Sequence, residues 1–186
     1  MTKITRRAAA IGAVSGLLLA AACGNGVGTN GAAEIDGRVT QAMNYLDNNF
    51  PATRDLKDRA TGVLVMPVVT EAGLGLGGSY GRGALQVNGA SVDYYSATQA
   101  TWGLQVGAKQ YSHVLYFMTE DALREFRESN GWAAGAEVAA VFLNDGENLA
   151  ADTTTVLSPV VAVVFGEAGA HLGATLEGTK YTRIIP

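Results

Sequence analysis

The chain has 186 residues and a formal net charge of −4, from 13 Lys and Arg against 17 Asp and Glu. This length is that of one domain with an ordinary hydrophobic core, which argues against a two-domain protein. Because nucleic-acid binding depends on neutralising phosphates with basic side chains, the acidic balance excludes a general nucleic-acid binder.

Residues 1–23 predict an export signal that ends at a lipoprotein-type cysteine. Lys3, Arg6 and Arg7 form a basic head, an apolar run covers residues 8–19, and three alanines follow as a cleavage site. The apolar run is too short for a stable membrane span. Since the leader holds three of the basic residues and none of the acidic ones, its removal leaves a net charge of −7. The paired arginines also resemble the start of a twin-arginine signal, so the general secretory and twin-arginine routes both stay open.

Cys23 is the only cysteine in the chain, so it has no intramolecular disulfide partner. Its position directly after the cleavage site resembles a bacterial lipoprotein signal, in which the cysteine carries fatty acyl chains such as palmitate and becomes the new N-terminus. We expect Cys23 to be a lipid anchor; the alternative is an ordinary secretory signal with an incidental cysteine. Gly24, where some lipoproteins have Asp, favours the periplasmic face of the outer membrane in a Gram-negative host.

The mature chain begins with a tether and two predicted helices. Residues 24–33 are uncharged and rich in Gly and Asn, which predicts a flexible tether in front of a domain over residues 34–186. Apolar residues then recur every three or four positions, which predicts an amphipathic helix over residues 34–49 that packs on the domain and ends at Pro51. The alternative is a helix that lies on the membrane surface, which its acidic polar side disfavours. A second short helix is expected after Thr53. It carries the most basic part of the mature protein, Arg54, Lys57 and Arg59.

Residues 73–83 form the most unusual segment, Gly-Leu-Gly-Leu-Gly-Gly-Ser-Tyr-Gly-Arg-Gly. Side chains on a strand alternate between faces, so the odd positions form one nearly bare face, while Leu74, Leu76, Tyr80 and Arg82 point the other way. A row of glycine in a strand implies sharp twisting, or another backbone or a ligand lying directly on that face. The glycines of this motif are Gly73, Gly75, Gly77, Gly78, Gly81 and Gly83.

The rest of the chain predicts strands, turns and one further helix. Pro67 interrupts a strand over residues 62–69, which suits a bulge or an edge. Asn88-Gly89 predicts a two-residue hairpin turn, and Thr119 predicts the cap of a helix over residues 119–129. Further strands are expected over residues 84–87, 91–95, 101–118, 132–143, 153–165 and 170–184. The sum is a single α+β domain with a strongly curved, mainly antiparallel sheet, a few helices and Gly-rich strands.

Catalytic motifs are weak. Residues 77–81 match the nucleophile elbow G-x-S-x-G around Ser79, and His171 follows in the chain order of an esterase triad. The elbow requires a helix after the serine, whereas a hairpin is predicted here, so a serine esterase ranks third among the hypotheses. The glycines also lack the lysine of a phosphate-binding loop.

His113, in an apolar strand, is expected to be structural. No cluster has metal-ligand spacing, so neither a metal nor another cofactor is expected.

Basic side chains supply the candidates for binding an anionic lipid headgroup. Arg82 and Lys109 lie on the glycine-rich strands, and the alternative for both is a solvated charge or a pair with a nearby acid. The complete set of candidates is Arg54, Lys57, Arg59, Arg82 and Lys109.

The segment Gly62-Val-Leu-Val-Met-Pro-Val-Val-Thr-Glu-Ala-Gly73, together with the glycines up to Gly83, resembles the signature of the SYLF lipid-binding family, an actin-binding domain in its eukaryotic members. The resemblance continues in order through Tyr94-Tyr-Ser96, Gly103-Leu-Gln-Val-Gly107, Phe117-Met-Thr119, Asn130-Gly-Trp132 and Leu176-Glu-Gly-Thr-Lys180, and covers residues 35–184.

This resemblance implies a non-enzymatic domain that binds phospholipid. Two positions depart from the family pattern: Glu71 stands where a lysine is common, and the helix over residues 34–49 does not match the basic amphipathic segment of eukaryotic members. Actin is not expected as the natural partner of an exported bacterial protein.

Two hypotheses for function follow. The first is an exported, lipid-anchored envelope lipoprotein whose SYLF-type domain binds membrane phospholipid. The second is a structural or interaction protein of the cell envelope that binds a protein partner through an exposed sheet face or edge.

Overall fold

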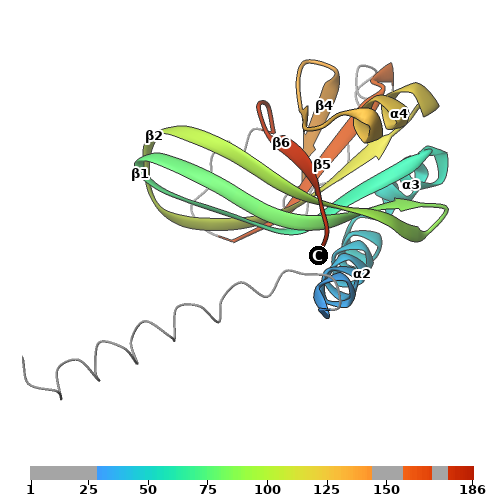
Figure 1. The fold of residues 1–186 in the computed structure, drawn as a ribbon, viewed down its shortest axis with the longest axis horizontal. Helices are drawn as coiled ribbons and strands as arrows, with labels where there is room; N and C mark the ends of the chain where they lie inside the picture. The colour runs from blue at the N-terminus through green and yellow to red at the C-terminus, as the bar shows by residue number, and fades with distance from the viewer. Residues whose placement is uncertain (1–28, 144–156, 169–175) are drawn as a thin grey trace, which may run out of the picture.

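The computed structural model describes residues 29–143, 157–168 and 176–186. These residues form an α+β domain with three α-helices, one short 3-10 helix and a six-stranded, mainly antiparallel sheet (Figure 1). The predicted fold class is therefore confirmed. Cys23, the first part of the predicted tether and His171 lie outside the described residues.

All the predicted helices are present. Helix α2 (Gly31–Asn49) ends just before the short helix η2 (Pro51–Thr53), which leads into α3 (Arg54–Arg59). Helix α4 (Glu120–Glu128) begins where predicted, and the Thr119 hydroxyl caps it by accepting the Ala122 N–H at 3.2 Å. None of the described helices is both long enough and apolar enough to cross a membrane.

Two very long strands replace several shorter predicted ones. Strand β1 (Gly62–Val87) and strand β2 (Ala90–Phe117) form one antiparallel ribbon. Asn88 and Gly89 join them with φ angles of 51° and 77°, as expected for a two-residue hairpin turn. The ribbon contains a register shift at the predicted Pro67 bulge, between Met66 and Val69.

Strands β6 and β5 pair with two separate parts of β2, along the edge opposite β1, and β3 and β4 pair with them in turn. The sheet order is β3-β6-β2-β5-β4, with β1 paired along β2. The prediction of a single strand over residues 132–143 is wrong. This segment forms two strands: β3 (Trp132–Ala133), which pairs with β6, and β4 (Val138–Phe142), which pairs in parallel with β5. A turn separates the two, with the Val138 N–H donating to the Gly135 carbonyl. Strands β5 (Val160–Ala168) and β6 (Lys180–Ile184) are shorter than predicted within the described residues.

The β1–β2 ribbon bends back on itself near Gly73 and Gly107, at the end where Figure 1 carries the labels β1 and β2. Gly107 has a φ of 126°, a conformation that favours glycine. The bend brings the second half of β1 (residues 76–87) against its first half (residues 62–72). A Cβ atom at Gly81 would lie 2.7 Å from a Val69 methyl, and one at Gly83 would overlap the Val65 carbonyl oxygen. The bare glycine face therefore lies on another backbone, that of its own strand.

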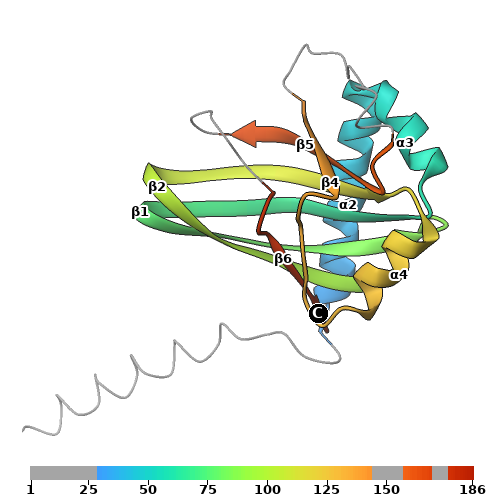
Figure 2. The ribbon, with the colours of Figure 1, turned by 90° about the horizontal axis from the view of Figure 1, so that it is seen from above.

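Helices cover the central part of the sheet on both faces (Figures 1 and 2). Helix α2 runs across the strands on one face, where Val39 and Leu46 pack on Val65. Helix α4 lies on the opposite face, where the Phe126 ring is 5.5 Å from the Trp132 ring. This double covering explains why the β5 sequence is almost continuously apolar.

Substitution of Gly83 by Ala is expected to lower the free energy of unfolding by about 3 kcal/mol, because the added methyl group overlaps the Val65 carbonyl oxygen of the facing backbone. Gly37 on α2 is the control, since an added methyl there has nothing within 4 Å. Gly37→Ala should raise stability by about 1 kcal/mol through helix propensity. Urea unfolding of both variants measures the difference, and equal stability of Gly83→Ala and wild type would contradict the close approach.

Candidate functional site

Two adjoining cavities of about 180 and 280 Å³ lie between α2 and β1. They share Arg38, Pro67 and Val68, and so form one continuous surface depression, which we name the α2–β1 groove.

The Pro67 bulge and the position of α2 shape this groove. The Pro67 carbonyl, displaced from the ladder at the register shift, accepts a hydrogen bond of 2.7 Å from the Ser112 hydroxyl. Its neighbour Val68 points outward and is 37% exposed. Helix α2 is fixed on the other side by Asp36, whose carboxylate accepts hydrogen bonds from Ser91 at 2.8 Å and Tyr94 at 2.9 Å.

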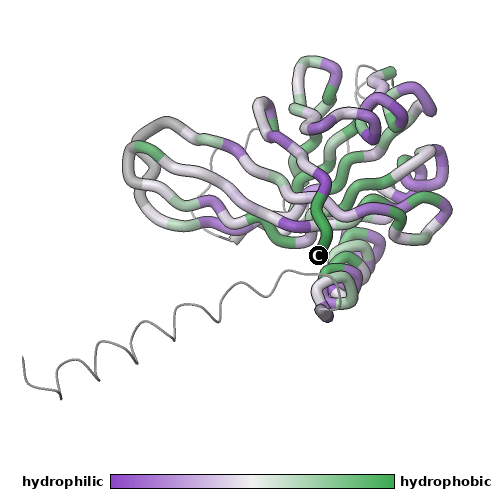
Figure 3. The backbone as a smooth tube through the Cα atoms, in the orientation of Figure 1, coloured by the Kyte–Doolittle hydropathy of each residue, from purple (hydrophilic) through white to green (hydrophobic). Residues whose placement is uncertain are grey.

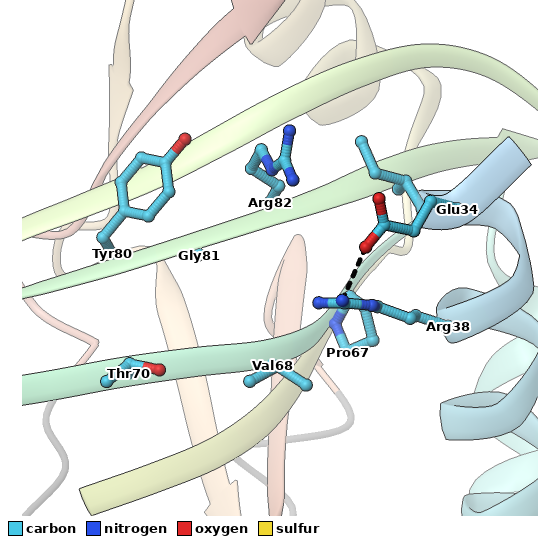
Figure 4. A pocket seen from close by; sticks show the side chains of 9 residues that line it. Glu34, Arg38, Pro67, Val68, Thr70, Tyr80, Gly81 and Arg82 are labelled. Atoms are coloured by element: carbon cyan, nitrogen blue, oxygen red, sulfur yellow. Dashed lines mark hydrogen bonds and ion pairs between the residues drawn. The ribbon is translucent and has the colours of Figure 1, made fainter. Parts of the chain in front are cut away.

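One end of the groove is polar and lies at the first turns of α2 (Figure 4). Tyr80 and Arg82 extend into it from the second half of β1, while Val68 and Thr70 line it from the first half. Arg38 of α2 completes this end and forms an ion pair of 2.6 Å with Glu34. With two arginines against one carboxylate, this end has a net positive charge.

The other end of the groove is apolar. The Tyr45 ring stacks on the Phe165 ring at 5.9 Å with an interplanar angle of 13°, and Tyr45 remains 39% exposed. Ala42 and Gly166 complete this end. The whole groove is thus amphipathic, with arginines at one end and an aromatic wall at the other.

The five predicted headgroup candidates do not converge on one site. Arg54 and Lys57 hold α3 against α2: Arg54 donates to the Asp47 carbonyl, and the Lys57 ammonium lies 3.1 Å from the Asp47 carboxylate. Arg59 donates to the carbonyl of Asp55 within its own helix. Of the five, only Arg82 lines the groove.

Lys109 pairs with a nearby acid, as the alternative prediction stated. Its ammonium lies 3.2 Å from the carboxylate of Glu71, directly opposite in the β1–β2 register. Glu71 is only 4% exposed, so its charge depends on Lys109 for compensation. The acidic residue that departs from the family pattern therefore has a structural partner in this chain.

Sequence reasoning missed Arg38 and Tyr45. Both lie on the predicted helix over residues 34–49, and the four-residue spacing of Glu34 and Arg38 was visible as a helical ion pair. The sequence did not show that the Pro67 bulge, 29 positions after Arg38, faces this helix.

Residues 98–183 match the family model described as Ysc84, Las17-binding protein actin regulator. This match confirms the resemblance to the SYLF family. It extends from the middle of β2 to β6 and includes Lys109, whereas Arg38 and Arg82 precede it. No curated protein matches the chain.

Ser79 does not form a nucleophile elbow. It lies in the middle of β1, which continues as a strand to Val87, and no helix follows it. Its side chain is buried on the glycine face and has no hydrogen-bond partner among the described residues.

Within the described part of the chain, no group of three or more His, Cys, Asp or Glu side chains is placed to hold a metal ion.

His113 is fully buried, and its Nε2 atom lies 2.8 Å from the Tyr181 hydroxyl. Burial lowers the pKa of His113 to about 3 and raises that of Tyr181, so both side chains are neutral at pH 7. The pair joins β2 to β6 inside the domain, which agrees with the predicted structural role.

The His113 pKa predicts a loss of stability in acid. Since the folded-state pKa is below the ordinary value of 6.5, the unfolded state binds more protons between pH 6.5 and about 3. Stability should therefore fall by about 1.4 kcal/mol per pH unit through this window. His113→Gln, which keeps a hydrogen-bond acceptor for Tyr181, should remove this slope. Urea unfolding of both proteins at several pH values gives the difference, and parallel pH profiles would show that His113 does not contribute.

Proposed function

We propose that this chain is an exported lipoprotein whose SYLF domain binds phospholipid, and that the α2–β1 groove receives the lipid headgroup. Similarity to this family over residues 98–183 supports a function of the lipid-binding or actin-regulator type. The observation that carries the lipid proposal is the amphipathic groove, with Arg38 and Arg82 at one end and the Tyr45–Phe165 stack at the other.

The chemistry of the groove suits a phospholipid. The phosphate of a phospholipid accepts charge-assisted hydrogen bonds from guanidinium groups. The glycerol carbons esterified to it pack favourably against apolar side chains. The groove's two cavities together lie at the small end of the range of ligand pockets, so they fit a headgroup and the adjoining glycerol, with the acyl chains left outside. SYLF domains are generally non-enzymatic, and a binding role agrees with this.

The anchor proposal joins this site to the membrane. We propose that Cys23 is acylated, which places the protein in the cell envelope, on the periplasmic face of the outer membrane in a Gram-negative host. Residues 24–30 then span at most about 25 Å between the anchor and the start of α2, which lies at the polar end of the groove. The mass of the mature N-terminal peptide tests the anchor, and an unmodified Cys23 would contradict it.

Replacement of the groove arginines should weaken binding to anionic vesicles. Each arginine near an anionic surface contributes about 1 kcal/mol, so Arg38→Gln with Arg82→Gln should lower the affinity about 30-fold. Co-sedimentation with phosphatidylglycerol-containing vesicles measures this for a chain starting at residue 24, which contains every described residue.

The matched control is Arg59→Gln with Arg124→Gln, which removes the same charge from exposed positions outside the groove. An equal loss in both double variants would contradict the groove as the site. No binding of the wild-type chain to any anionic vesicle would contradict lipid binding altogether and favour a protein partner.

A further inference from the structure

The sheet face that α2 covers continues beyond the start of the helix and is open there. We name this open area the outer patch. Its members are all exposed and lie on neighbouring strands: Leu76, Gly78, Tyr80, Thr98, Ala100 and Lys180.

Strand register places these residues on one face. Leu76, Gly78 and Tyr80 alternate along β1, on the side opposite the buried glycines. Gly78 pairs with Ala100, Tyr80 pairs with Thr98, and Thr98 pairs in turn with Lys180 of β6. The outer patch is therefore a continuous surface that extends over three strands.

Large apolar side chains on this surface are exposed. Leu76 is 64% exposed and Tyr80 is 52% exposed. By contrast, Ala84, further along the same face of β1, is buried under α2. Helix α2 covers this face of the sheet only as far as Arg82. Arg82 lines the groove together with Ile35, which lies in the first turns of α2. Tyr80 belongs to both surfaces, so the outer patch is a direct continuation of the α2–β1 groove.

The distribution of charge identifies the kind of partner. The chain has a net charge of −4, yet residues 72–81 and 94–108 contain no charged side chain. Figure 3 accordingly shows the bend of the ribbon mainly in white and green, with purple further along its strands, on β6 and on the helices. The outer patch contains no carboxylate, and its borders carry Lys180 and Arg82. An apolar and aromatic centre with a basic border is typical of a surface that enters the interface of an anionic bilayer.

We propose that the outer patch docks on an anionic lipid bilayer, with Leu76 and Tyr80 entering the headgroup region and Lys180 and Arg82 lying against the phosphates. This inference rests on the proposed lipid-binding function and adds an orientation to it. The groove then opens toward the bilayer surface, and the tether leaves the domain on the same side, since α2 begins at the groove.

Single-cysteine labelling tests this orientation. A chain starting at residue 24 has no cysteine, because Cys23 is the only one in the sequence. Leu76→Cys and Ala100→Cys place an environment-sensitive fluorophore on the outer patch. Glu125→Cys, on exposed α4 across the sheet, and Val92→Cys, 44% exposed near the hairpin turn, are the controls. With vesicles of phosphatidylcholine and phosphatidylglycerol, emission should increase severalfold and shift to shorter wavelength at positions 76 and 100 only.

An unlabelled variant gives a second measurement. Leu76→Asp should weaken vesicle co-sedimentation about tenfold, since it removes an inserting side chain and adds a like charge, while its urea midpoint stays unchanged because residue 76 is exposed. Val92→Asp is the matched control and should bind as wild type does.

Each outcome decides the proposal. Vesicle binding without a response at positions 76 and 100, or with a response at 125, would overturn the outer patch but leave lipid binding intact. Absence of vesicle binding would overturn both. A response that rises with protein concentration in the absence of vesicles would identify a second copy of the chain as the occupant and overturn the bilayer proposal.

Discussion

The contact of β1 with itself determines the architecture of this domain. At Gly81 and Gly83 the second half of the strand approaches the first so closely that no side chain fits between them. Interior packing tolerates little extra volume, so any larger residue on this face forces the two halves apart. The rest of the long ribbon follows from this contact, because β2 pairs along the whole of β1 and must bend with it. Strands β5 and β6 then pair with separate parts of the bent β2.

This self-contact also divides the ribbon into two chemically different faces. The glycine face is used entirely for packing, which leaves Ser79 buried and no longer able to act as an accessible nucleophile. The opposite face keeps its side chains and is covered by α2 only in part. The groove lies where the helix and the Pro67 bulge meet on this face, and the uncovered remainder is the outer patch. A motif that resembled a catalytic loop thus has on its reverse face the two side chains that line the groove, Tyr80 and Arg82.

Local signals in the sequence were sufficient for the helices, the hairpin turn and the alternation of faces. Thr119 caps α4, and Asn88-Gly89 turns the ribbon, because both act within a few residues of their own position. The division of residues 132–143 into β3 and β4 was not predictable, since their pairing partners β6 and β5 lie far away in the sequence. The groove has the same limitation: Arg82 was identifiable as a basic residue on a glycine strand, but its proximity to Arg38 depends on where α2 packs. Arg54, Lys57 and Lys109 were equally basic in sequence, and only the fold shows that each has an acidic or carbonyl partner.

These pairings explain how an acidic protein can present a basic surface. The Coulomb energy of an exposed charge decays over about 8 Å at physiological ionic strength, so a bilayer senses the nearest side chains much more strongly than the net charge. Lys109 is neutralised by Glu71 on the glycine face, and Lys57 by Asp47 at the junction of α2 and α3. Arg38, Arg82 and Lys180 lie around the α2–β1 groove and the outer patch, where Glu34, the ion-pair partner of Arg38, is the one acidic residue among the side chains that line these two surfaces. The local sign is therefore positive on the face that also exposes Leu76 and Tyr80, which is the face that we propose to lie toward an anionic membrane.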